Sequence, residues 1–262
     1  MLRPRRWGSR PHPAPRLRGF SINRLVPNIL TLAALSAGLT AVRFGLEGRW
    51  QIAVGAVLLA MVLDGLDGRV ARLMNATSRF GAELDSLSDF VCFGVVPGLL
   101  LYLWIRDGGG GLAWGAVLIY AVCTALRLAR FNVALDDVDR PAWTHHFFSG
   151  VPSPAGAGLA LLPMIASFDV AWSGLQSPLL VGAWLVLVGL GMVSRLPTFS
   201  GKRLRVKRQH VPLVLVAIAA VAAGLASEPW LTLLALGLAY LASVPIAVVQ
   251  ARRLARTTDA TP

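Results

Sequence analysis

The sequence predicts an all-α integral membrane protein, a polytopic helical bundle with eight spans. Of its 262 residues, 55% are hydrophobic and only 15% are charged, whereas about a quarter are charged in soluble domains. The apolar residues fall in blocks of roughly 17 to 22, the length that crosses a ~30 Å hydrocarbon core at 1.5 Å per residue. The eight blocks are 25–44, 51–67, 86–105, 112–131, 151–168, 178–194, 211–226 and 230–249.

The basic residues set the expected orientation of these spans. The net charge is +12, and all but three of the 25 basic residues lie on one side of the membrane when the N-terminus is placed inside. The exceptions are Arg43, Arg49 and Arg106. The positive-inside rule therefore predicts an inner-membrane protein with both termini in the cytoplasm. The charge attracts anionic lipid headgroups, so membrane lipid is an expected partner and nucleic acid is not.

The longest predicted loops, about 68–85, 132–150 and 195–210, all fall on the cytoplasmic side. Any active site is therefore expected at that face. Two predicted spans contain Pro163 and Pro245, which membrane helices tolerate when neighbours satisfy the freed carbonyls.

Four of the 13 acidic residues lie in or beside predicted spans: Asp64, Asp67, Asp85 and Asp89. A carboxylate at membrane depth is costly unless it is paired or binds metal, so such residues are functional candidates. Asp64 and Asp67 are three residues apart, and Asp85 and Asp89 are four apart. Either spacing puts a pair on one helix face. A loop of about 17 residues would let two antiparallel helices bring both pairs together.

Four carboxylates in close quarters repel one another unless a cation intervenes. Carboxylate oxygens suit Mg²⁺, Mn²⁺ or Ca²⁺ better than zinc. Gly65 and Gly68 leave room beside them, and Arg72 and Arg79 offer cations that match phosphate geometry. The combination predicts a site for a lipid-linked phosphate or diphosphate. The alternative is that the aspartates only form ion pairs with nearby arginines.

The segment from Asp64 to Asp89 is DGLDGRVARLMNATSRFGAELDSLSD. It fits D-x-x-D-G-x-x-A-R, then eight residues, then G-x-x-x-D-x-x-x-D, at every fixed position. In this it resembles the CDP-alcohol phosphotransferases. The resemblance implies a six-helix core over residues 21–208, with two additional helices at 209–250. Basic tails would occupy 1–20 and 251–262.

The resemblance also implies residue roles. Asp64, Asp67 and Asp85 would hold two divalent ions, Mg²⁺ or Mn²⁺, and Asp89 would be the general base while lying near the second metal. The segment PNILT at 27–31 resembles the family's first-helix motif. The residues expected to contact CDP are Asn28, Thr31, Asp64, Asp67, Gly68, Arg72 and Ser78. Asn28 could instead cap the first helix. Similar proteins form homodimers through membrane helices.

Flanking segments narrow the resemblance to bacterial membrane-bound phosphatidylserine synthases. They are LDSLSDFVCFGVVPGLLLY (84–102), ALRLARFNV (125–133), FFSGVPSPAGAG (147–158) and GMVSRLPTFSGKR (191–203). One departure is Cys92, where a serine is expected. A zwitterionic acceptor needs a cation for its carboxylate, which makes Arg127, Arg130 and Asn132 candidates for binding serine. The arginines could instead be membrane anchors.

The expected reaction is CDP-diacylglycerol plus L-serine giving phosphatidylserine and CMP. Direct in-line displacement is expected, although the sequence leaves a covalent aspartyl intermediate open. Two alternatives stay open. The acceptor could be glycerol 3-phosphate, inositol phosphate or choline. A cation transporter could also carry intramembrane carboxylates, but these aspartates gather at one face and no inverted repeat is visible.

Overall fold

A computed structural model describes residues 25–105, 110–135, 147–194, 197–199 and 210–258. Helices make up nearly all of the described chain, and two three-residue strands pair with each other. The elements are α1 (Leu25–Leu46), α2 (Trp50–Leu73), α3 (Arg79–Asp89), the π-helical turn η2 (Phe90–Val95), α4 (Val96–Trp104), α5 (Gly110–Leu135), β1 (Phe147–Ser149), α6 (Ser153–Ala160), α7 (Leu162–Ala166), the 3₁₀ turn η5 (Ser173–Gln176), α8 (Pro178–Val193), β2 (Pro197–Phe199), α9 (Val211–Ser227) and α10 (Pro229–Thr258).

Five helices in the described chain are long and apolar enough to cross a membrane: Leu25–Leu46, Trp50–Leu73, Arg79–Trp104, Gly110–Val133 and Pro229–Val249. Pro178–Val193 and Val211–Ser227 are shorter apolar helices. The all-α, polytopic membrane class is therefore confirmed, and the number of eight spans stays a prediction.

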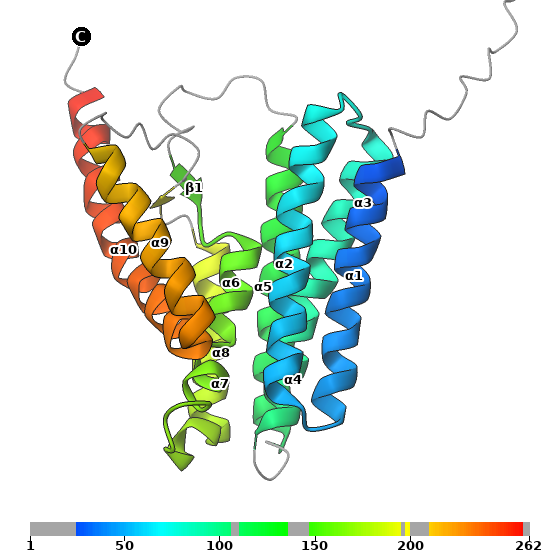
Figure 1. Cartoon of the computed structure of the whole chain (residues 1–262), viewed down its shortest axis with the longest axis vertical. Coiled ribbons are helices and arrows are strands. Elements are labelled where there is room, and N and C mark those ends of the chain that lie inside the picture. The colour runs from blue at the N-terminus through cyan, green and yellow to red at the C-terminus, as the bar shows by residue number, and fades with distance from the viewer. Residues whose placement is uncertain (1–24, 106–109, 136–146, 195–196, 200–209, 259–262) are drawn as a thin grey trace, which may run out of the picture.

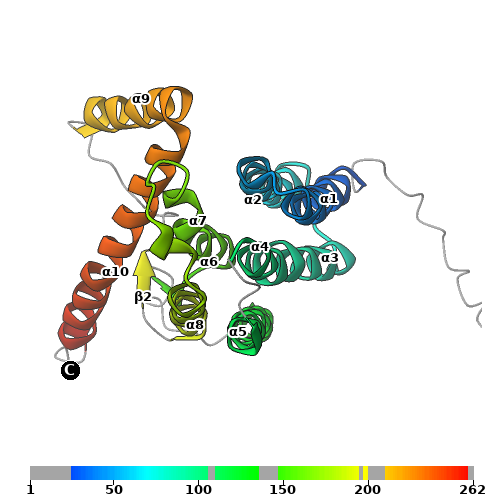
Figure 2. The same ribbon diagram turned by 90° about the horizontal axis from the view of Figure 1, so that it is seen from below.

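The helices form a bundle in which α1 and α2 pack closely side by side and α5 packs against α8 (Figures 1 and 2). The start of α1 and the end of α10 lie at the same end of the bundle (Figure 1), as the predicted topology requires. Helix α10 packs on α7 and β2, and α9 packs on α10. No residue of α9 is buried.

Small residues let α1 approach the chain that follows the second aspartate pair. A Cβ on Gly38 would lie 2.6 Å from Cys92 Sγ, and one on Gly45 would lie 2.6 Å from Leu100 Cδ2. Dispersion forces favour such close packing where lipid supplies no hydrophobic drive between helices. These contacts fix α1 against η2 and α4, and so beside the aspartates.

At two of the prolines that interrupt helical hydrogen bonding, an aromatic side chain donates to the freed carbonyl. Pro97 cannot donate to the Phe93 carbonyl, which accepts the Tyr120 hydroxyl at 2.7 Å. Pro163 likewise frees the Leu159 carbonyl, which accepts Trp184 Nε1–H at 2.8 Å. The expectation that neighbouring helices satisfy such carbonyls is confirmed for Pro163.

The predicted 17-residue loop between the aspartate pairs is wrong. Helix α2 runs on to Leu73 and α3 begins at Arg79, so the connection is only the segment 74–78. The apolar pattern ends near Asp67, but Arg, Ala and Leu beyond it are good helix formers and continue the helix. Asn75 turns the chain with a φ of 50°, and Ser78 Oγ accepts the Gly81 N–H at 3.0 Å to cap α3.

Two other predicted boundaries change. The block 151–168 was expected as one helix, and it is divided into α6 and α7 by a turn at Leu161, two residues before Pro163. The tail 251–262 was expected to lie outside the helices, but α10 continues to Thr258. Charge alone does not end a helix when its residues are good helix formers. Within the predicted loop 132–150, α5 reaches Leu135.

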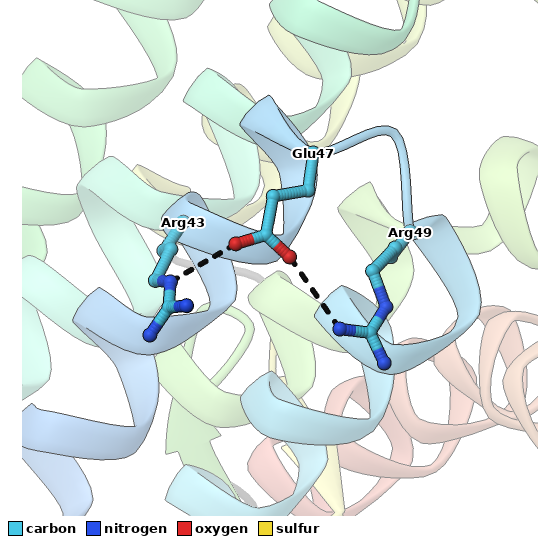
Figure 3. Close-up of polar contacts among 3 residues, drawn as sticks. All are labelled: Arg43, Glu47 and Arg49. Carbon is cyan, nitrogen blue, oxygen red and sulfur yellow. Dashed lines mark hydrogen bonds and ion pairs between the residues drawn. The ribbon is translucent and has the colours of Figure 1, made fainter.

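The turn between α1 and α2 explains how two basic residues are accommodated away from the predicted cytoplasmic side. Glu47 accepts Arg43 Nε at 3.0 Å and Arg49 Nη1 at 3.4 Å (Figure 3). The Arg49 guanidinium also lies 5.0 Å from the centre of the Phe44 ring. These exposed pairs add little stability, but they partly neutralise the charge that the positive-inside rule disfavours at this end.

Gly150 joins the two-stranded ladder to α6. It follows β1, which pairs antiparallel with β2, and its φ is 82°. A Cβ there would overlap the Met192 carbonyl oxygen and lie 2.7 Å from the Ser194 carbonyl oxygen. The next residue, Val151, donates its N–H to the Gly191 carbonyl at 3.2 Å. The segment before α6 is therefore held on the end of α8.

Gly150→Ala is expected to destabilise the protein more than Gly48→Ala. Both glycines have positive φ, but nothing lies within 4 Å of a Cβ at Gly48. Left-handed backbone costs alanine about 1–2 kcal/mol, and forced packing at Gly150 adds about 1–3 kcal/mol. Unfolding in detergent measures the difference. Equal losses in the two variants would show that the contact with the end of α8 is not tight.

Candidate metal centre

Three carboxylates meet between the C-terminal part of α2 and α3. One oxygen from each of Asp64, Asp67 and Asp85 can be chosen so that all three lie within 4.8 Å of one another. Asp67 is buried, with 5% of its surface exposed, and the other two are half-buried. The predicted approach of the two aspartate pairs is therefore present for these three residues, although a short connection brings it about.

Asp89 lies one helical turn beyond Asp85, at the last residue of α3. Its carboxyl group interacts with that of Asp64. The Asp89 Oδ1 atom is enclosed and accepts no hydrogen bond from the described residues. The π-helical turn η2 begins at the next residue, and such turns are frequent at functional sites. Asp89 thus presents an unused acceptor beside the other three aspartates.

The alternative that these aspartates merely pair with arginines finds no support in the described ranges. There, the two ion pairs are those that Glu47 forms with Arg43 and Arg49 at the far turn. Arg72 and Arg79 are exposed. A cluster of carboxylates without a paired cation fits a divalent ion with hard oxygen ligands. Asp64, Asp67 and Asp85 are the residues that could hold it.

The predicted nucleotide residues of α1 lie next to this cluster. Thr31 is buried, with 4% of its surface exposed, and its hydroxyl donates to Asp67 Oδ2 at 2.6 Å. Asn28 is half-buried within α1, which the structure describes from Leu25, so it does not cap the helix. A Cβ on Gly81 would lie 3.0 Å from Asn28 Oδ1. The amide is therefore close to the first turn of α3.

The surface of α2 beside the carboxylates is open. A Cβ on Gly65 would meet nothing within 4 Å, and one on Gly68 would meet only Arg72 Nη1 at 3.6 Å. Arg72 and Ser78 are exposed, and the hydroxyl of Ser78 caps α3. The room expected from the two glycines is present, while the CDP contacts of Gly68, Arg72 and Ser78 stay predictions.

The three candidate serine residues on α5 differ in what they contact. Arg127 is buried, and its Nε and Nη1 donate to the Val151 carbonyl and to Ser153 Oγ, each at 2.6 Å. Its Nη2 donates to nothing in the described chain. Arg127 also lies close enough to Asp89 for their charges to interact. Its guanidinium is therefore partly available beside the carboxylates.

Arg130 and Asn132 contact other elements. Arg130 Nη1 donates to the Val193 carbonyl at 2.8 Å and Nη2 to the Ser194 carbonyl at 3.2 Å. Asn132 Nδ2 donates to Ser86 Oγ at 3.0 Å. Arg130 thus holds the end of α8, and Asn132 ties α5 to the residue next to Asp85. Their roles in binding serine stay predictions.

Sequence reasoning missed two polar residues around Arg127. Ser153 is fully buried at the start of α6, and its position between two prolines was the available signal. Tyr240, on α10, is within electrostatic range of Arg127. No local pattern in the sequence relates α10 to α5, because the two are far apart along the chain.

Comparison with known proteins agrees with this geometry. The family described as CDP-alcohol phosphatidyltransferase matches residues 24–193, and a second family, CDP-alcohol phosphatidyltransferase 2, matches 210–245. The CDP-diacylglycerol–serine O-phosphatidyltransferase of Mycobacterium leprae is 38% identical over 248 residues, which cover 94% of this chain and 82% of that protein.

More distant organisms contain relatives with the same printed name. The Helicobacter pylori protein (strain 26695) is 32% identical over 74% of this chain and 81% of its own length. The Methanocaldococcus jannaschii protein is 34% identical over 70% of this chain and 80% of its own length. With a family match that takes in all four aspartates, the chain belongs to the CDP-alcohol phosphatidyltransferase family.

Proposed function

We propose that this chain transfers the phosphatidyl group of CDP-diacylglycerol to the hydroxyl of L-serine and releases CMP. The cluster of Asp64, Asp67 and Asp85 is the observation that carries the reaction class. Serine as the acceptor rests on the name of relatives that cover most of the chain. The flanking segments that resemble phosphatidylserine synthases support the same acceptor.

The reaction takes place at the cytoplasmic face of an inner membrane. The distribution of basic residues supports this orientation, and the apolar helices keep the acyl chains of the substrate in lipid. Asp64, Asp67 and Asp85, together with Asp89, would hold two divalent ions, Mg²⁺ or Mn²⁺. Bound divalent ions supply charge neutralisation for the diphosphate and for the departing CMP.

Asp89 takes the proton from the serine hydroxyl. As the hydroxyl oxygen bonds to the phosphorus of the phosphatidyl group, the bond from that phosphorus to the CMP oxygen breaks. The proton moves to Asp89, and CMP leaves with the electron pair of the broken bond. The enclosed Asp89 Oδ1, which has no donor in the described chain, supports this role because a general base needs a free acceptor.

Arg127 binds the serine carboxylate through Nη2, which has no acceptor among the described residues, while Nε and Nη1 stay bonded to Val151 and Ser153. Bonds to backbone and hydroxyl oxygens do not neutralise the guanidinium charge, which suits an incoming anion. Arg130 and Asn132 support this site from the same helix, through their bonds to the end of α8 and to Ser86. Asn28, Gly68, Arg72 and Ser78 border the CDP moiety.

The proposal also assigns a role to each segment of the chain. Residues 21–208 form the catalytic membrane domain, 209–250 supply two further helices, and 1–20 and 251–262 are basic cytoplasmic tails. Two copies associate through membrane helices as a homodimer, as the family resemblance implies.

The acceptor assay tests the function directly. Purified protein in detergent receives CDP-diacylglycerol and Mn²⁺, with serine, glycerol 3-phosphate, inositol phosphate or choline offered one at a time. CMP release is expected with serine alone. Release with another acceptor would preserve the aspartate chemistry and reject serine. No release with any acceptor, from folded protein, would reject the enzyme assignment.

Asp89→Asn is expected to lower serine-dependent CMP release by about 10²–10⁴-fold, the usual contribution of a general base. The amide keeps the size of the side chain, but it is far less basic than a carboxylate and cannot take the proton of the serine hydroxyl. Asp169→Asn, at an exposed position, is the control and should leave the rate unchanged. Gel filtration and thermal unfolding monitor folding. A normal rate from folded Asp89→Asn protein would refute the base assignment.

Arg127 and Arg130 should differ in substrate selectivity. Arg127→Gln is expected to raise KM for serine about tenfold or more and to change KM for CDP-diacylglycerol little, because a hydrogen bond to a charged group contributes about 1.5–3 kcal/mol. Arg130→Gln should lower thermal stability and affect both substrates alike, since its described donors serve the end of α8.

Initial-rate kinetics with each substrate varied in turn separates the two outcomes. An equal rise of both KM values in Arg127→Gln would show that Arg127 only holds the segment before α6. A serine-selective effect in Arg130→Gln would move the carboxylate site to that residue.

A further inference from the structure

Thr31 is bonded to both helices that carry the aspartates. From α1, its hydroxyl reaches Asp67 Oδ2 on α2 at 2.6 Å. Its backbone carbonyl accepts the hydroxyl of Ser88, on α3, at 3.4 Å. Ser88 is buried and precedes Asp89 in the chain. One residue of the first helix thus connects to Asp67 and to the neighbour of Asp89.

The hydroxyl of Thr31 has a single proton and two acceptors within reach. The carbonyl of Pro27 lies at 3.1 Å, which is the usual bond of a threonine to the preceding helical turn. Asp67 Oδ2 is closer, at 2.6 Å. That length falls in the range of 2.5–2.7 Å found for a hydroxyl that donates to an ionised carboxylate. The proton therefore points to Asp67.

This bond holds Asp67 without using up its capacity to bind a cation. An ionised carboxylate has about four lone-pair sites, and the Thr31 hydroxyl occupies one. Donors behind a ligand fix its orientation and tune its affinity for metal. An oxygen of Asp67 also lies within 4.8 Å of an oxygen of Asp64 and of an oxygen of Asp85. The remaining lone pairs of Asp67 can therefore serve a shared ion.

We propose that Thr31 is a positioning residue for the divalent ion, acting through Asp67, and not a contact of the nucleotide. This inference rests on the proposed function, since it assumes that the aspartates bind metal. With 4% of its surface exposed and its hydroxyl committed to Asp67, Thr31 offers little to a nucleotide. The half-buried Asn28, one turn earlier, stays the candidate for that contact.

Direct metal binding tests the proposal with three changes at one position. Thr31→Val keeps the shape and removes the hydroxyl, Thr31→Ala removes it without bulk, and Thr31→Ser retains it. Thr40→Val is the matched control, because Thr40 is an exposed threonine of the same helix whose hydroxyl donates to the Ser36 carbonyl at 2.6 Å. The full chain is used in detergent, without substrate.

Free Mn²⁺ is measured by electron paramagnetic resonance as each protein is titrated with Mn²⁺. Thr31→Val and Thr31→Ala are expected to bind Mn²⁺ about tenfold more weakly, the lower end of the effect of losing such a donor. Thr31→Ser and Thr40→Val should bind as the wild type does. In an Asp67→Asn background, Thr31→Val should cause no further loss, because the two residues act as one unit.

Unchanged Mn²⁺ affinity in folded Thr31→Val and Thr31→Ala proteins would overturn the inference. If these variants also bind CDP-diacylglycerol more weakly at saturating Mn²⁺, Thr31 is instead a nucleotide contact. Failure of the proposed function looks different, since wild-type protein would then bind no Mn²⁺ or release no CMP with serine.

Discussion

Repulsion among carboxylates inside a membrane protein is the constraint on which the rest of this structure depends. Asp64, Asp67 and Asp85 bring oxygens within 4.8 Å of one another, and Asp89 interacts with Asp64 beside them. Among the described residues, no arginine forms an ion pair with these four side chains. Charges so placed repel one another, and a divalent cation would relieve that repulsion. A divalent ion held by these carboxylates could also neutralise a diphosphate, so the same cluster suits that substrate group.

Contacts between helices hold these groups together, because irregular backbone inside a membrane would leave its polar groups without hydrogen bonds. Gly38 lets α1 lie against Cys92, and Thr31 on the same helix then reaches Asp67. Beyond Asp89 the helix widens into η2, and the Tyr120 hydroxyl serves the carbonyl freed by Pro97. On α5, Arg127 anchors the start of α6. Each of these bonds joins elements that are distant in sequence.

Much of this could be predicted from the sequence, because apolar length marks helices and carboxylates within them are costly. The aspartate spacing predicted the cluster itself. The bond from Thr31 to Asp67 spans 36 positions, and no local pattern announces it. Arg130 donates to backbone carbonyls. Every residue has such a carbonyl, so the sequence does not show which ones an arginine will contact. The extension of α2 past Asp67 was missed because hydropathy marks where lipid ends, whereas helix propensity decides where a helix ends.

The central claim is that the carboxylate cluster binds divalent metal. Anomalous diffraction from crystals grown with Mn²⁺ tests it most directly, because the ion is located by its own scattering. The account predicts a peak between Asp64, Asp67 and Asp85, with carboxylate oxygens at about 2.0–2.6 Å. A map without a peak in the cluster, from protein that releases CMP with serine, would contradict it. The aspartates would then require another source of neutralisation.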